Sequence, residues 1–137
     1  MAIRLKVGDA EFDANVIQTC RFLTNTPNDS NARSTDVVNT MVLTGKILAG
    51  LDGVVDNTKA LAEWSMIKAE RADSYRPVEV RVFSAGLVVR EVRFPNAFVV
   101  DYSESYGDEE GVGTFFITVR QKKDKFEATE IAGGFDA

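Results

Sequence analysis

Residues 36–48, DVVNTMVLTGKIL, decide the fold class of this chain. Apolar side chains and threonines recur here with a period of two, which is the side-chain period of a β-strand. One face carries Val37, Met41, Leu43 and Ile47, and the other carries Val38, Thr40, Val42 and Thr44. Because both faces are fairly apolar, we expect a long strand with protein on each side.

The same alternation recurs on both sides of this stretch. Expected strands are Ile3–Val7, one or two pieces within Glu11–Phe22, Val78–Val82, Leu87–Phe94, Phe98–Tyr102 and Phe115–Val119. Gly8-Asp9 and Ser84–Gly86 supply turns, and Pro95-Asn96 should end the strand before it. At 137 residues the chain predicts a single domain over 1–137. Its fold class is mainly β: a closed or nearly closed two-sheet barrel or sandwich of six to eight strands with one inserted α-helix.

The inserted helix is predicted over Asn57–Ala72. Ala60, Leu61, Trp64 and Ile67 share one face at the helical period, and Trp64 should pack that face on a sheet. Asp56 or Asn57 can cap its first turn, and Arg71 lies at its last turn. The back of the helix carries Ala62, Met66 and Ala69, which fits either a contact surface or an ordinary solvent-facing helix.

Composition removes many function classes. The chain has no His, so Ser–His and Cys–His nucleophiles and zinc helices of the HExxH type are excluded. Cys20 is the only cysteine and is interpreted as a packed core thiol. The net charge of −5 and the mixed signs along the strands do not favour sequence-specific nucleic-acid binding. No secretory leader or membrane-spanning stretch is evident. We therefore expect the protein to assemble in the cytoplasm, and its export after assembly stays open.

Carboxylates give only weak signals for a catalytic or metal site. Asp108, Glu109 and Glu110 lack the spacing of an EF-hand and are interpreted as part of an acidic, Gly-rich loop over Ser103–Gly113. Glu91 and Asp101 alternate with apolar residues, as on the solvated face of a sheet. We therefore expect no enzyme, no cofactor and no metal.

The order of these segments resembles the hemolysin-coregulated protein (Hcp) and tail-tube family of type VI secretion systems, contractile phage tails and related contractile injection systems. The resemblance rests on Val16–Phe22 followed by a long polar loop and a long strand, on Leu61 and Trp64 on a helix before a β-hairpin, and on Phe94–Tyr102 followed by an acidic loop and Phe115–Gln121. It covers nearly the whole chain.

The resemblance implies a structural protein whose copies close into a homohexameric ring that stacks into a hollow tube, with sheath, spike or baseplate proteins and translocated cargo as further partners. The loop Thr24–Thr35 corresponds to the family's arm that reaches a neighbouring subunit. Candidate interface residues are Thr24, Asn25, Pro27, Asn28, Asn31, Arg33 and Thr35 of that loop, together with Met66. The overall acidity suggests a tube lumen that repels nucleic acid or acidic cargo. The alternative from the residues alone is a monomeric β-barrel that binds a small ligand or peptide.

Overall fold

A computed structural model describes residues 1–25, 38–47, 58–68, 71–108, 112–121 and 129–134 of the chain. Its strands are β1 (Ala2–Val7), β2 (Ala10–Phe12), β3 (Ile17–Asn25), β4 (Val38–Ile47), β5 (Arg76–Ser84), β6 (Leu87–Ser105), β7 (Gly113–Gln121) and β8 (Glu130–Ala132). The helices are α1 (Lys59–Ser65) and a single 3₁₀ turn, η2 (Ala72–Ser74). The expected mainly β fold with an inserted helix is confirmed.

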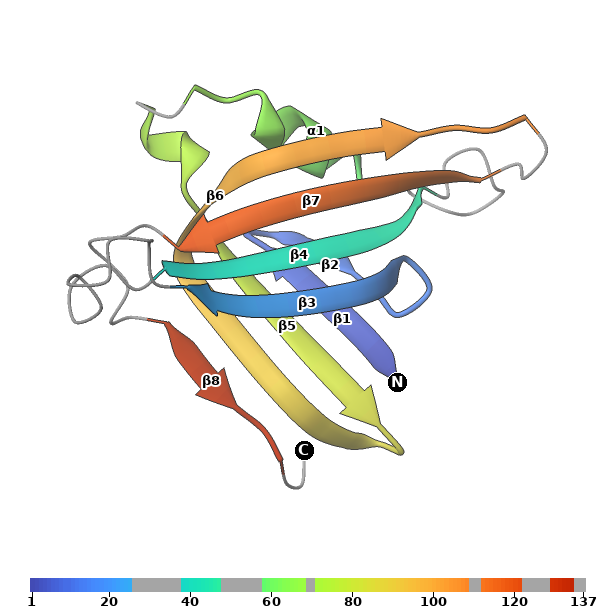
Figure 1. Cartoon of the computed structure of the whole chain (residues 1–137), viewed down its shortest axis with the longest axis vertical. Coiled ribbons are helices and arrows are strands. Elements are labelled where there is room, and N and C mark those ends of the chain that lie inside the picture. Colours follow the sequence, from blue (N-terminus) through green and yellow to red (C-terminus); the bar gives the residue numbers. More distant parts are fainter. Residues whose placement is uncertain (26–37, 48–57, 69–70, 109–111, 122–128, 135–137) are drawn as a thin grey trace.

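All eight strands belong to one antiparallel sheet in the order β2-β1-β5-β6-β7-β4-β3, with β8 paired to β6. The sheet folds over on itself into two layers (Figure 1). We call β3, β4, β7 and residues 97–105 of β6 the front layer, and β1, β2, β5, residues 87–94 of β6 and β8 the back layer. The last strand of the path, β3, comes back near β1, so the barrel is nearly closed.

Strand β6 passes from the back layer to the front layer. The expectation that Pro95-Asn96 ends a strand was wrong. Pro95-Asn96 does not end a strand, because β6 runs unbroken for 19 residues. Its register with β5 shifts between the pairs Arg76–Ala97 and Val78–Phe94, directly at the proline. Pro95 lacks an N–H and is tolerated at such an irregularity, and the Asn96 N–H donates to Gln121 Oε1 at 3.1 Å. The proline therefore bends one strand between two layers instead of separating two strands.

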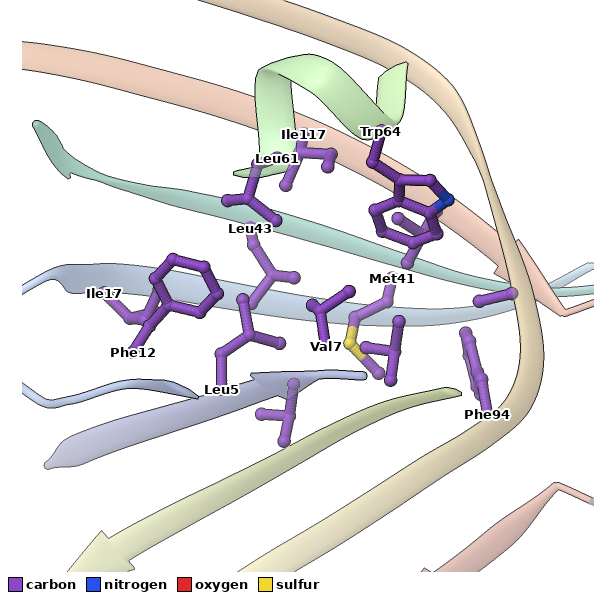
Figure 2. Packing of buried hydrophobic residues seen from close by; sticks show 14 of the residues in the cluster. Leu5, Val7, Phe12, Ile17, Met41, Leu43, Leu61, Trp64, Phe94 and Ile117 are labelled. Carbon is purple, nitrogen blue, oxygen red and sulfur yellow. The ribbon is translucent and has the colours of Figure 1, made fainter. Parts of the chain in front are cut away.

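The space between the layers is filled by apolar side chains (Figure 2). Met41, Leu43, Ile117 and Val119 project from the front layer, and Leu5, Val78, Val80 and Phe94 from the back layer; all are at most 2% exposed. On β7 the expected alternation holds, since Phe115, Ile117 and Val119 are buried while Phe116 and Arg120 are exposed. Val37 and Leu48, at the ends of the stretch 36–48, lie outside the described residues.

Helix α1 packs on this core through Leu61 and Trp64, as predicted (Figure 2). The helix ends at Ser65, earlier than the expected end at Ala72, and the Met66 N–H donates to the Glu63 carbonyl. The Trp64 indole N–H donates to the Ser74 carbonyl at 2.8 Å, so the chain after the helix folds back over the tryptophan. The proposed caps Asp56 and Asn57 lie outside the described residues, and Arg71 precedes η2, where it pairs with Asp73 at 3.2 Å.

The acidic loop also differs from the sequence interpretation. Ser103–Ser105 belong to β6, so the loop begins later than expected. Near the C-terminus β8 pairs with Glu91–Arg93 of β6, and the Gly134 N–H donates to the Val88 carbonyl, which extends the contact with β6 beyond β8. The turns at Gly8-Asp9 and Ala85-Gly86 are confirmed, and positive φ at Ala85 and Gly86 gives the two-residue hairpin that follows strand twist.

Candidate assembly surface

The outward side of the front layer is a flat, mostly polar surface, which we call the polar face. Because cross-strand partners share a face, the pairing registers place its residues in rows that cross the four strands. The rows are Ser105–Thr114–Lys46, Ser103–Phe116–Thr44–Thr19, Asp101–Thr118–Val42–Arg21 and Phe98–Arg120–Thr40–Leu23.

Hydroxyl groups dominate this polar face. Thr19 Oγ1 and Thr44 Oγ1 share a short hydrogen bond across β3 and β4. Arg120 Nε donates to Thr40 Oγ1 at 3.3 Å, and this hydrogen bond links β7 to β4. Among the residues of these rows, the one large apolar side chain that is exposed is Phe116, at 39%; Val100, at the register shift of β6, is 40% exposed. Such a surface offers hydrogen bonds and little adhesion, because it lacks a continuous apolar patch.

Charge on the polar face is unbalanced. Arg21, Lys46 and Arg120 point outward against the single carboxylate of Asp101. None of these three cations has a carboxylate within ion-pair distance in the described part of the chain. The polar face thus carries a net positive charge, although the chain as a whole has a net charge of −5.

The outward side of the back layer has the opposite character, because carboxylates stand opposite most of its cations. Arg81 Nε lies 3.1 Å from Glu79 Oε1 and 3.2 Å from Glu91 Oε1. Lys6 stands opposite both Glu11 and Glu79 in the strand register. An open groove crosses this surface, lined mainly by charged residues, among them Arg4, Lys6, Glu11, Asp13, Glu79 and Arg81. Since the groove is wide and its charges are mixed, it does not have the enclosed, apolar character of a small-ligand site.

At each side of the front layer a strand edge is open: it has no hydrogen-bonded partner strand among the described residues, although β1 lies near β3 and α1 contacts β6. β3 is the last strand of the path and pairs only with β4 among the described strands. On the other side, β5 pairs with β6 only as far as Ala97, so in the described structure no strand covers that edge of β6 from Phe98 to Ser105. Unpaired strand edges present rows of backbone donors and acceptors, and they are templates for pairing with another chain.

The predicted interface residues are only partly within the described structure. Thr24 and Asn25 end β3 and pair with Asn39 and Val38, and Thr24 Oγ1 donates to Asn39 Oδ1 at 3.1 Å. Met66 is 79% exposed beside the end of α1. The remaining predicted interface residues, Pro27, Asn28, Asn31, Arg33 and Thr35, lie outside the described residues. The roles of all eight therefore remain predictions.

The other candidate residues are ordinary surface or core groups. Glu91 pairs with Arg81, Asp101 is exposed, and Tyr102 and Tyr106 both donate their hydroxyls to the Glu104 carboxylate. Asp108 is exposed, while Glu109 and Glu110 lie outside the described residues. Cys20 packs against the core, and burial raises the pKa of its thiol to about 11.

Two kinds of feature are absent from the described residues. No three His, Cys, Asp or Glu side chains gather there as metal ligands would. Nor does that part of the chain hold a helix with the length and apolar character needed to cross a bilayer.

Sequence reasoning missed the polar face as a unit. The alternation had already put Thr114, Phe116, Thr118 and Arg120 opposite the core side of β7, and Thr40, Val42 and Thr44 opposite the core side of β4. What it lacked was the register that sets Arg21, Lys46 and Arg120 on one surface. Counting the positive and negative side chains at the outward positions of each expected strand would have indicated this cationic surface.

Comparison with known proteins identifies the fold. No family model matches the chain, and no curated protein sequence matches it. Among solved structures, Hcp1 from Flavobacterium johnsoniae superposes with a TM-score of 0.64 at 18% identity over 100% of both chains. Hcp1 from the E. coli EAEC 042 pathovar gives a TM-score of 0.56 at 8% identity, covering 98% of this chain and 100% of that one.

A component of an extracellular contractile injection system is also similar. The chain matches a protein of the PVC sheath-tube complex in its extended state with a TM-score of 0.55 at 10% identity, covering 96% of this chain and 88% of that one. The fold of this chain is therefore that of Hcp and of contractile-particle proteins, and the fold implied by the resemblance in sequence is confirmed.

Proposed function

We propose that the chain is a structural subunit whose copies form a homohexameric ring, and that these rings stack into the inner tube of a contractile injection apparatus such as a phage tail, a phage-like particle or a type VI secretion system. The observation that carries the proposal is the front layer, which ends in two open strand edges on a fold shared with Hcp. Sheath, spike and baseplate proteins are the further partners this function requires. No catalytic role is proposed.

The two open edges are complementary in direction. Three antiparallel pairings separate β3 from residues 97–105 of β6, so these two edges run in opposite directions. β3 of one copy placed beside β6 of the next therefore continues the antiparallel sheet. This contact joins two different surfaces, which is the head-to-tail arrangement that closes a ring when the rotation between copies fits. Each edge is then covered by a neighbour and no longer invites uncontrolled aggregation.

The edges are also complementary in charge. Arg21 on β3 and Asp101 on β6 lie at opposite ends of the same row of the polar face. If the seam between copies continues the rows, Arg21 of one copy meets Asp101 of the next. Opposite charges directly across strands stabilise pairing and help to fix register.

The relative widths of the layers support the front layer as the one that faces the lumen. The front layer has four strands, whereas five strands contribute to the back layer. The narrower layer fits the smaller, inner circumference. Strands about 4.8 Å apart give a front layer about 19 Å wide, so six copies make a circle about 37 Å across at the backbone. Allowing about 5 Å for side chains on each side leaves a channel about 27 Å wide.

The monomeric ligand-binding alternative receives no support from the described core. A barrel that holds a ligand needs an open interior, and here Trp64, Phe94 and Met41 occupy the space between the layers and are at most 2% exposed.

Mass measurement and imaging of the purified chain test the ring. Light scattering should give about 91 kDa for six copies of the 15.1 kDa chain, and negative-stain images should show rings with a central channel. A 15 kDa species without rings at all concentrations would refute the proposal. Deletion of residues 24–35 tests the predicted arm, since we expect a folded chain with weakened assembly.

Charge exchange tests the seam itself. Arg21→Asp and Asp101→Arg should each reduce ring formation, because like charges then meet across the seam, and the double variant should restore it. Arg93→Asp, which makes the same change on the back layer, is the matched control and should assemble normally. Rings that tolerate both single variants, or a double variant as defective as its parents, would place the seam elsewhere.

A further inference from the structure

The polar face has a charge that the composition of the chain does not predict. Net charge and acidic composition suggested a lumen that repels acidic cargo. On the face that would line the channel, however, three cations stand against one carboxylate, Asp101. If Arg21 is neutralised by the Asp101 of a neighbouring copy, Lys46 and Arg120 still carry two positive charges per copy.

These two cations are available to a ligand. Arg120 is exposed, and its Nε is used by Thr40 Oγ1, which orients the guanidinium and leaves its two terminal nitrogens without a protein acceptor in the described residues. Lys46 is half-buried next to Thr114 in the strand register and has no carboxylate partner among the described side chains. A guanidinium fixed in this way is well suited to bind carboxylates through two parallel hydrogen bonds.

The back layer supplies an internal comparison. There Arg81 is held between two glutamates, so its charge is satisfied within the chain. Lys6 and Arg93 of the back layer form no ion pair with the described residues either, but each stands opposite two glutamates in the strand register. Lys46 and Arg120 of the polar face stand opposite uncharged residues only. The difference is therefore not a general property of the surface of this chain.

The spacing of the cations argues for a polypeptide ligand. Lys46 and Arg120 are on adjacent strands but three rows apart, and with about 6.6 Å between rows they stand about 20 Å apart. Uncharged Thr44, Val42, Thr118 and Phe116 lie between them. Nucleic-acid binding depends on clustered cations that neutralise closely spaced phosphates. Carboxylates scattered over a protein surface, together with hydroxyl and modest apolar contacts, match this polar face better.

We infer that the polar face forms a cationic lumen wall that binds acidic polypeptide cargo weakly through Lys46 and Arg120. This inference rests on the proposed tube function. Each contact is exposed and screened by salt, so individual sites hold cargo loosely. Repetition of the two cations around a ring raises the overall affinity through multivalency, while each contact stays easy to break when cargo moves.

The experiment uses rings of the full chain that have first been verified by negative-stain microscopy. The probe is a fluorescein-labelled 24-residue Gly/Ser peptide with Glu at every fourth position, and the matched peptide has Lys at the same positions. Fluorescence anisotropy should show the Glu peptide binding at least tenfold more tightly than the Lys peptide at low ionic strength. Because screening weakens exposed charges, this preference should disappear at 0.5 M salt.

Variants locate the site on one layer. The double variant Lys46→Gln/Arg120→Gln should weaken binding of the Glu peptide at least tenfold while rings still form. The matched control, Lys6→Gln/Arg93→Gln on the back layer, removes the same number of charges and should bind as the parent does.

Three results would overturn the inference while leaving the tube subunit in place: rings without preference for the Glu peptide, a front-layer variant that binds normally, or a thymidine oligonucleotide of equal charge that binds as tightly as the peptide. The last result would assign the wall to nucleic acid. A chain that never forms rings would instead overturn the proposed function.

Discussion

Replacement of Trp64 by phenylalanine tests how the helix is attached to the barrel. Trp64 is 2% exposed and is the only tryptophan of the chain. Its indole N–H donates to the Ser74 carbonyl at 2.8 Å, and the Arg76 guanidinium lies 5.7 Å from the ring centroid. This one side chain thus joins α1, η2 and the start of β5. Trp64→Phe keeps an aromatic ring in the core but removes the hydrogen-bond donor.

Two losses add up to the expected effect. The Ser74 carbonyl loses the indole N–H as a donor, which costs about 1–3 kcal/mol. The smaller ring also buries about two methylene equivalents less, worth about 1.5 kcal/mol. We expect the free energy of unfolding to fall by about 3 kcal/mol. For a chain of this size, that corresponds to a decrease in Tm of roughly 10 °C.

Urea denaturation followed by far-ultraviolet circular dichroism measures the change, since the variant has no tryptophan fluorescence. Parent and variant must be compared at the same protein concentration, because any assembly of the folded state raises the apparent stability. Glu63→Ala is the control: it lies in the same helix but is exposed, so its effect should stay within about 0.5 kcal/mol.

A loss below about 0.5 kcal/mol for Trp64→Phe, with an unchanged denaturant slope, would refute the reasoning. It would mean that the Ser74 carbonyl finds another donor without cost and that the segment after α1 is not held by the indole. A loss equal to that of Glu63→Ala would lead to the same conclusion.

Three further predictions concern the front layer. Gly45→Ala should destabilise the fold by about 1–3 kcal/mol, because the new Cβ would lie 2.6 Å from both Phe115 Cζ and the Val16 carbonyl oxygen; Gly107→Ala, which meets nothing within 4 Å, is the control in urea denaturation. Gln121→Met should cost about 1–3 kcal/mol and accelerate amide hydrogen exchange at Asn96, which loses its acceptor at the bend of β6; unchanged exchange would contradict this. Cys20 should react slowly with thiol reagents at pH 8 while the chain is folded, because burial raises the pKa of its thiol from 9.0 to about 11. Since the folded pKa lies above the unfolded one, the thiol's contribution to stability is complete below pH 9 and is lost as the pH rises through about 11, a dependence that Cys20→Ala should remove.

Several elements could be predicted from the sequence because they depend on local patterns. The period-two alternation in Phe115–Val119 and in Ile3–Val7 fixed both the strands and their buried faces. Leu61 and Trp64 were assigned to the buried side of a helix for the same kind of reason. The absence of His restricted the chemistry before any fold was known. These inferences need only neighbours a few residues apart.

Elements that depend on distant partners were not accessible in this way. Pro95 reads as a strand breaker, and only the pairing of β6 with β5 before it and with β7 after it turns the proline into a bend. Helix α1 ends at Ser65, and the Ser74 carbonyl, ten residues after Trp64, accepts a hydrogen bond from the indole N–H of that tryptophan; β8 pairs with the edge of β6. The sequence around each of these residues is compatible with either outcome.

The candidate assembly surface shows the same division most clearly. Alternation alone determined that Arg120 and Thr44 point away from the core. Only the antiparallel register, which joins strands as far apart in sequence as β4 and β7, put Lys46, Arg120 and Arg21 on one surface and left two sheet edges open beside them. Strand register depends on contacts between distant segments, so a local pattern specifies which side a residue faces but not which residues share that side with it.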